Sequence, residues 1–138
     1  MNKEHELYFH LVNKLAYLAL IKGEVPVGAV VLNANYKVIG QGYNQVIQTQ
    51  DPTAHAEIVA IRQACAYQNN YRLAGCILLI SLEPCNMCWG AVNQARIEKV
   101  YFSCFREKDQ LHYPKTIKGG IMNEAESNTL TKFFKNKR

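Results

Sequence analysis

Residues 76–88 read Cys-Ile-Leu-Leu-Ile-Ser-Leu-Glu-Pro-Cys-Asn-Met-Cys, a short apolar run that leads into a proline and two cysteines. A continuous apolar run over residues 76–81 is typical of a β-strand that is covered on both faces. Pro84 suits the first turn of a helix, which we expect to continue to about Gln94. The stretch therefore predicts a buried strand followed by a helix.

Strand and helix patterns alternate on both sides of this stretch. Leucines recur at helical spacing near the start of the chain, which predicts an amphipathic helix over residues 4–22 that packs on a sheet. The other predicted elements are strands 27–32, 37–41 and 99–102, helix 54–68 after the Asp51-Pro52-Thr53 start signal, and a final helix around Leu130, Phe133 and Phe134. The first two strands are expected to form a hairpin. The alternation favours a three-layer α/β/α domain with a mixed sheet, in a single domain over residues 1–138.

The bulk composition fits an ordinary globular protein. The chain has 138 residues, of which 49% are hydrophobic and 20% charged, with a net charge of +5 that leans toward a polyanionic partner. The apolar run Leu15–Ile21 is too short to span a bilayer, and no secretory signal is recognisable, so we expect a cytoplasmic protein without a membrane segment. Five cysteines, an odd number, favour metal binding or burial over a disulfide framework.

Three potential metal ligands lie at the predicted starts of two helices. Cys85 and Cys88 are three residues apart, so both sulfurs lie on one helix face and can reach the same ion. The positive end of a helix favours the thiolate form that zinc requires. His55 offers a nitrogen ligand from the other helix. Three protein ligands and an open position are typical of catalytic zinc, so we predict one Zn²⁺ per chain.

Glu57 lies two residues after His55, about 200° around a regular helix, and is not expected to bind the same ion as a simple neighbour. Beside the open position it is placed to take a proton from water, which makes it the predicted catalytic residue. H-x-E paired with P-C-x-x-C is the signature of zinc deaminases. A redox-active C-x-x-C would leave Glu57 unexplained. A structural zinc would need a fourth ligand, and Cys65, Cys76 and Cys104 are better explained as core residues.

Several stretches resemble the bacterial tRNA-specific adenosine deaminases. They are Glu-Val-Pro-Val-Gly-Ala-Val at 24–30, Asp-Pro-Thr-Ala-His-Ala-Glu-Ile at 51–58, Asn-Tyr-Arg-Leu at 70–73, Ser-Leu-Glu-Pro-Cys-Asn-Met-Cys at 81–88, and Arg96-Ile97. The similarity extends from the first helix to about Phe102. The zinc motif is shared with the wider cytidine and guanine deaminase superfamily, whereas the stretches at 51–57 and 70–73 favour the tRNA branch.

This resemblance implies a cytidine-deaminase-like fold, a homodimer, and conversion of adenosine to inosine at the wobble position of a tRNA anticodon loop. It also implies that His55, Cys85 and Cys88 hold zinc and that Glu57 moves protons. Asn44 matches the asparagine that hydrogen-bonds the target nucleotide, although a turn residue after a strand would explain it equally well.

Two departures from the family bear on the substrate. Residues 103–108 lack the small-residue-rich segment and the Asp that usually follow the last strand, and the loop after them is several residues shorter. Trp89 stands where the family has alanine, so it is expected either to pack at a dimer contact or to reshape a wall near the site. The basic C-terminus, with Lys135, Lys137 and Arg138, fits both a phosphate contact and a solvated helix end.

Two alternatives to a tRNA deaminase stay open on the sequence. The first is a deaminase of a free base or nucleoside such as guanine or cytosine, which would use the same zinc and glutamate and is favoured by the shortened loop. The second is a non-catalytic, zinc-stabilised RNA-binding module.

Overall fold

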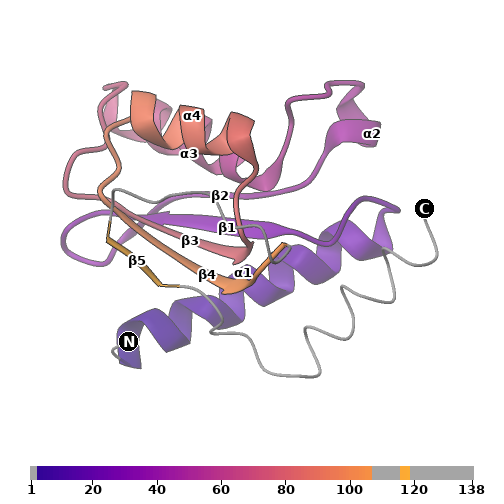
Figure 1. The fold of residues 1–138 in the computed structure, drawn as a ribbon, viewed down its shortest axis with the longest axis horizontal. Helices are drawn as coiled ribbons and strands as arrows, with labels where there is room; N and C mark the ends of the chain where they lie inside the picture. Colours follow the sequence, from indigo (N-terminus) through magenta and orange to yellow (C-terminus); the bar gives the residue numbers. More distant parts are fainter. Residues whose placement is uncertain (1–2, 107–115, 119–138) are drawn as a thin grey trace.

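Five strands form the centre of the molecule, and helices lie on both faces of their sheet (Figure 1). The structure is a computed structural model that describes residues 3–106 and 116–118. The elements are α1 (Lys3–Ile21), β1 (Gly28–Leu32), β2 (Val38–Tyr43), α2 (Val46–Thr49), α3 (Ala56–Gln68), β3 (Ile77–Leu82), α4 (Asn86–Gln94), β4 (Lys99–Cys104) and β5 (Thr116–Lys118).

The sheet is mixed, as the sequence predicted. Its strand order is β2-β1-β3-β4-β5, with β1 antiparallel to β2 and β3, and with β4 parallel to β3 and β5. The predicted hairpin is present, and its turn is held by Asn33, whose side-chain oxygen accepts hydrogen bonds from the backbone N–H groups of Asn35 and Lys37. The predicted three-layer α/β/α fold is confirmed.

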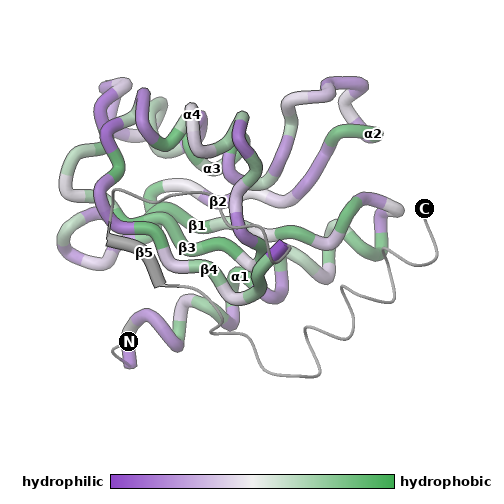
Figure 2. Tube along the Cα trace, in the orientation of Figure 1, coloured by the Kyte–Doolittle hydropathy of each residue, from purple (hydrophilic) through white to green (hydrophobic). Residues whose placement is uncertain are grey.

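Both faces of the two central strands are buried, which explains their apolar sequences. Every residue of β1 and of β3 is buried, and Figure 2 shows hydrophobic colour along both strands. One face packs against α1 through Phe9, Val12 and Leu15. The other face packs against α3 and α4 in a larger cluster. No helix among the described residues is long and apolar enough to cross a membrane.

Trp89 belongs to this larger core cluster, with 9% of its surface exposed. The cluster also contains Leu82 at the carboxyl end of β3. The indole is therefore buried in the core of a single chain, and a dimer contact is not needed to cover it.

Helix α3 lies unusually close to β2 because that strand carries two glycines. A Cβ added at Gly40 would lie 2.3 Å from the carbonyl oxygen of Ala60, and one at Gly42 would lie 2.7 Å from the carbonyl oxygen of Ala56. Both distances are shorter than a van der Waals contact. The two glycines therefore allow α3, whose N-cap residue is His55, to lie close to β2.

Gly40→Ala is expected to destabilise the protein by about 3 kcal/mol, since backbone must move to admit the methyl group. Gly90→Ala is the matched control: nothing lies within 4 Å of a Cβ there. Because Gly90 lies in α4, alanine should leave stability unchanged or raise it by about 0.5–1 kcal/mol. Urea unfolding monitored by circular dichroism measures both. Equal stability of the two variants would contradict the close packing.

The start of α3 differs from the prediction. The helix begins at Ala56 rather than near Ala54, and neither Asp51 nor Thr53 caps it. The side-chain oxygen of Asn44 instead accepts a hydrogen bond from the Ala56 N–H at 2.8 Å. Helix α2 and strand β5 were not predicted. The predicted final helix and the basic C-terminus lie outside the described residues.

Candidate active site

The three predicted metal ligands come together at one point. The Nδ1 atom of His55 lies 3.6 Å from the sulfur of Cys85 and 3.5 Å from the sulfur of Cys88. The ligand atoms of these residues all lie within 4.8 Å of one another. One nitrogen and two sulfurs at such spacing can fill three of the four positions of a tetrahedral zinc site, so the residues present fit this metal.

Helix starts place these ligands. His55 is the N-cap residue of α3, and Cys85 is the N-cap residue of α4. Cys88 follows in the first turn of α4, where it is fully buried. Free N–H groups at a helix start favour a negative charge nearby, which suits a thiolate at the start of α4.

Hydrogen bonding within the group favours a thiolate at Cys85. Hydrogen bonds from Cys88 and His55 lower the pKa of Cys85 to about 3. The same interaction with Cys85 raises the pKa of His55, and it also raises that of Cys88, which burial raises further. The lowered pKa of Cys85 favours the thiolate form that zinc binds.

Cys65, Cys76 and Cys104 are not part of this group. Among residues 3–106 and 116–118, His55, Cys85 and Cys88 are the one set of three or more candidate ligands close enough to share an ion. Cys76 is buried, whereas Cys65 and Cys104 are half-buried against the core. This arrangement agrees with their interpretation as packing residues, and it leaves the zinc site with three protein ligands.

Glu57 is buried beside the ligands, with 2% of its surface exposed. Burial raises the pKa of its carboxyl group, while hydrogen bonds with a backbone N–H and with the Cys88 side chain act in the opposite direction. The carboxyl group therefore lies next to the metal site without belonging to the ligand set. A buried carboxyl group with a raised pKa suits proton transfer near neutral pH.

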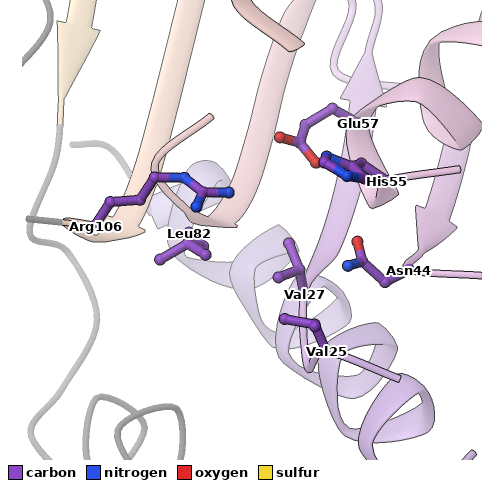
Figure 3. A pocket seen from close by; sticks show the side chains of 7 residues that line it. All are labelled: Val25, Val27, Asn44, His55, Glu57, Leu82 and Arg106. Atoms are coloured by element: carbon purple, nitrogen blue, oxygen red, sulfur yellow. The ribbon is translucent and has the colours of Figure 1, made fainter. Parts of the chain in front are cut away.

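A cavity of about 200 Å³ opens onto His55 and Glu57. It lies at one end of the sheet, where β1 begins and where β2, β3 and β4 end. The strand register explains this convergence, because Gly28 pairs with Tyr43 at the end of β2, and Leu82 pairs with Cys104 at the end of β4. Figure 3 shows the seven lining residues, which are Val25, Val27, Asn44, His55, Glu57, Leu82 and Arg106.

Asn44 lines the cavity and is also structural. Its side-chain oxygen accepts the Ala56 N–H, and its backbone N–H donates to the carbonyl of Val27 at 3.2 Å. The amide thus connects the end of β2 to the segment that carries His55 and Glu57. The two interpretations of Asn44 made from the sequence are therefore compatible, because this turn residue faces the pocket.

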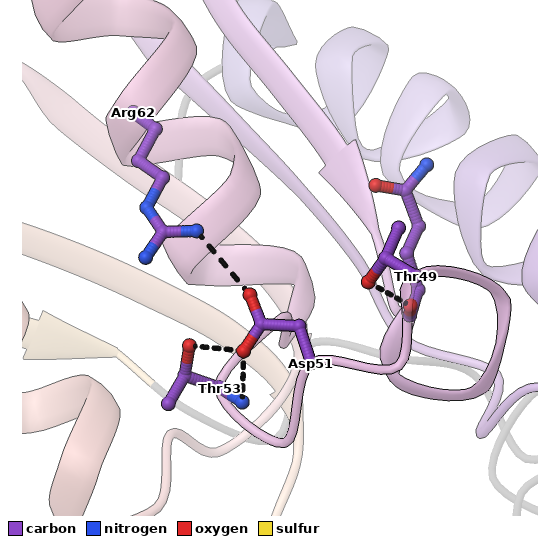
Figure 4. Close-up of polar contacts among 5 residues, drawn as sticks. Thr49, Asp51, Thr53 and Arg62 are labelled. Carbon is purple, nitrogen blue, oxygen red and sulfur yellow. Dashed lines mark hydrogen bonds and ion pairs between the residues drawn. The ribbon is translucent and has the colours of Figure 1, made fainter.

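The loop before His55 is held by a local network (Figure 4). Asp51 accepts hydrogen bonds from the backbone N–H of Thr53 at 2.9 Å and from its hydroxyl at 2.7 Å. These bonds lower the pKa of Asp51. Its other oxygen lies 3.6 Å from a guanidinium nitrogen of Arg62 on α3. The carboxylate is therefore engaged in shaping the loop that presents His55, which explains why it does not cap the helix.

The sequence analysis assigned no role to two residues that lie in this region. Glu24 is buried, and its carboxylate accepts hydrogen bonds from the N–H groups of Ile47 and Gln48, which fixes the start of α2. Arg106 lines the cavity from beyond the end of β4. The sequence did show that residues 103–108, which include Arg106, depart from the family pattern. That departure alone did not indicate that the Arg106 side chain lines the pocket.

Comparisons with known proteins identify the family to which the chain is similar. Residues 2–104 match the family model described as the cytidine and deoxycytidylate deaminase zinc-binding region. A tRNA-specific adenosine deaminase of Buchnera aphidicola subsp. Schizaphis graminum is 41% identical over 137 residues, which cover 91% of this chain and 90% of that relative.

Solved structures agree with this placement. A structure from studies of A-to-I editing by tRNA:A34 deaminases matches with a TM-score of 0.77 and 32% identity, over 85% of this chain and 99% of that chain. A guanine deaminase from Bacillus subtilis matches with a TM-score of 0.70 and 32% identity, over 100% of this chain and 96% of that chain. The chain therefore belongs to the zinc-binding deaminase family of the cytidine and deoxycytidylate deaminases and, within it, to the tRNA-specific adenosine deaminases.

Proposed function

We propose that this protein deaminates adenosine to inosine at the wobble position of a tRNA anticodon. The observation that carries the proposal is the buried Glu57 carboxyl group, which lies beside the His55, Cys85 and Cys88 ligand set and lines a pocket together with His55. Similarity to relatives named tRNA-specific adenosine deaminases supports the substrate. An anticodon base is already in a loop, so it can be unstacked into a pocket at low cost.

His55, Cys85 and Cys88 would hold the zinc ion. When bound there, zinc supplies a Lewis acid that lowers the pKa of water to about 7. Glu57 takes a proton from the water that adds to C6 of adenine, and it delivers this proton to N1 of the ring. Glu57 then takes the proton of the new hydroxyl group on C6 and passes it to the amino group. The bond from C6 to that nitrogen breaks, ammonia leaves, and C6 keeps a carbonyl oxygen.

Asn44 is proposed to orient the nucleoside. Because its side-chain oxygen is occupied by the Ala56 N–H, its NH₂ group is the part that can donate to a substrate acceptor. Val25, Val27 and Leu82 supply the apolar wall of the same pocket. The neighbouring backbone thus positions both the Asn44 NH₂ group and the apolar wall of the pocket before a substrate binds.

Deamination of a free purine such as guanine is the second candidate, favoured by the likeness to the Bacillus subtilis guanine deaminase. An ammonia-release assay on an anticodon stem-loop, adenosine, guanine and cytosine separates the two. We expect turnover on the stem-loop and inosine at the wobble position of the product. Turnover on a free base with none on the stem-loop would overturn the proposed substrate. A protein that holds zinc and binds the stem-loop without releasing ammonia from any substrate would be a binding module instead.

The homodimer, the cytoplasmic location and the single domain over residues 1–138 stay predictions. A reducing compartment suits the site, because Cys85 and Cys88 must remain thiolates to bind zinc. Sedimentation equilibrium measures the oligomeric state.

A further inference from the structure

Arg106 is the one pocket-lining residue, among those that the structure describes, whose side chain is always cationic. Figure 3 shows its guanidinium pointing from the end of β4 toward the side of the pocket that carries His55 and Glu57. The remaining lining side chains are apolar or belong to the proposed zinc and proton-transfer groups, apart from Asn44. The reaction at C6 of adenine assigns no task to this cation.

Contacts with Glu83 hold Arg106 in place. The backbone N–H of Arg106 donates to the carboxylate of Glu83 at 3.1 Å, and its side-chain Nε donates to the Glu83 carbonyl oxygen at 2.8 Å. Glu83 is itself buried, and its backbone N–H donates to the carbonyl of Cys104 at 2.8 Å. The bond at Nε holds one edge of the guanidinium plane against Glu83, and the outer edge, formed by the two terminal NH₂ groups, points in another direction.

A planar pair of NH₂ groups matches two oxygens of a phosphate, and such charge-assisted pairs are strong and directional. Within the pocket, Glu57 and Asn44 already provide the polar groups assigned to the base. A nucleotide inside an RNA strand is flanked by phosphates on both sides, whereas a free base or nucleoside has none. The cation at the pocket wall therefore matches the feature that separates these two substrate classes.

Building on the proposed function, we propose that Arg106 is a specificity-determining residue whose guanidinium binds a phosphate of the RNA strand next to the target adenosine. The phosphate contact selects a strand over a free base or nucleoside. Arg106 takes no part in moving protons, so its loss affects binding of the strand rather than the chemical step.

The test measures binding of an anticodon stem-loop by fluorescence anisotropy, in a Glu57→Gln background that keeps the RNA intact. Arg106→Gln is expected to raise Kd by roughly 10- to 100-fold. It should also reduce the slope of log K against log salt by about 0.7, the contribution of one phosphate on a single strand. Arg106→Lys should recover only part of the affinity, because lysine keeps the charge without the planar fork.

Stem-loops with a single uncharged methylphosphonate, on either side of the target adenosine, locate the contact. At one of the two positions the intact Arg106 protein should lose the same factor that Arg106→Gln loses. The Arg106→Gln protein should lose nothing further at that position, because the two changes remove the same contact. Additive losses at both positions would overturn the proposal.

Arg96→Gln is the matched control. It removes the same charge from an exposed residue in the connection that precedes β4, at the opposite end of that strand. It should change neither Kd nor the salt slope beyond twofold. Zinc content and turnover of free adenosine, with Glu57 intact, show whether Arg106→Gln disturbs the site through Glu83.

Each outcome decides between the two proposals. Stem-loop turnover by the intact protein, with no change in Kd for Arg106→Gln, would overturn the role of Arg106 and leave the proposed function standing. Loss of zinc, or an equal loss on adenosine and the stem-loop, would assign Arg106 a purely structural role. Absence of stem-loop turnover by the intact protein would overturn the proposed function and this inference with it.

Discussion

Glu57→Gln is expected to lower turnover by about 10³- to 10⁴-fold while the protein keeps one zinc ion and its fold. Glutamine has nearly the same shape as glutamate, so the buried site stays filled. The amide, however, cannot take a proton from water or deliver one to N1. Burial already raises the pKa of Glu57, so removal of its charge leaves stability unchanged or higher. Single-turnover kinetics, zinc content and thermal unfolding measure these three quantities.

Glu98→Gln serves as the control, because Glu98 is an exposed acid in the connection between α4 and β4. It should behave as the parent in all three measurements. Glu57→Ala should lose turnover to a similar extent, with a further loss of stability from the cavity that it leaves. Normal deamination by zinc-loaded Glu57→Gln would show that another group moves the protons.

The elements that the sequence predicted well are those whose pattern is set by burial alone. The run at residues 76–81 has no alternation because β3 is covered by α1 on one face and by α3 and α4 on the other. The zinc ligands were found for a similar reason, since their spacing already limits which side chains can share an ion. Local chemistry was sufficient in both cases.

Features that depend on long-range partners were not predictable. The start of α3 was misplaced because its first N–H is satisfied by Asn44, twelve positions earlier, rather than by a neighbouring Asp51. Helix α2 is only four residues long, and it depends on the buried carboxylate of Glu24. Prediction from neighbouring residues favours Asp51, the nearest candidate for the cap, whereas the fold places the more distant Asn44 at the start of the helix.

The pocket shows the same limit. Val27, Asn44 and Arg106 carry no shared motif, yet the register of four strands places them around one cavity. Resemblance to a family identified Asn44, because that residue is shared. It could not identify Arg106, because the segment that carries this residue departs from the family pattern.

Cys88→Ser is expected to abolish stoichiometric zinc binding, lowering zinc affinity by more than about 100-fold. A neutral hydroxyl group replaces the fully buried sulfur, and it is a poor substitute for a thiolate at zinc. Cys76→Ser is the matched control, since Cys76 is also buried but lies outside the ligand group. Zinc content after dialysis against a moderate chelator should stay at one per chain for Cys76→Ser and approach zero for Cys88→Ser.

Unfolding separates loss of the metal from loss of packing. A metal whose free concentration is about 1,000 times its Kd stabilises the folded state by about 4 kcal/mol. Removal of zinc by the chelator should therefore lower the free energy of unfolding of the parent and of Cys76→Ser by an amount of this order. Cys88→Ser should show no response to the chelator, because it has no bound metal to lose. If Cys88→Ser kept one zinc, or if Cys76→Ser lost it, the proposed ligand set would be wrong. If Cys88→Ser instead loses both zinc and deamination while it keeps its fold, the metal at His55, Cys85 and Cys88 is required for the reaction.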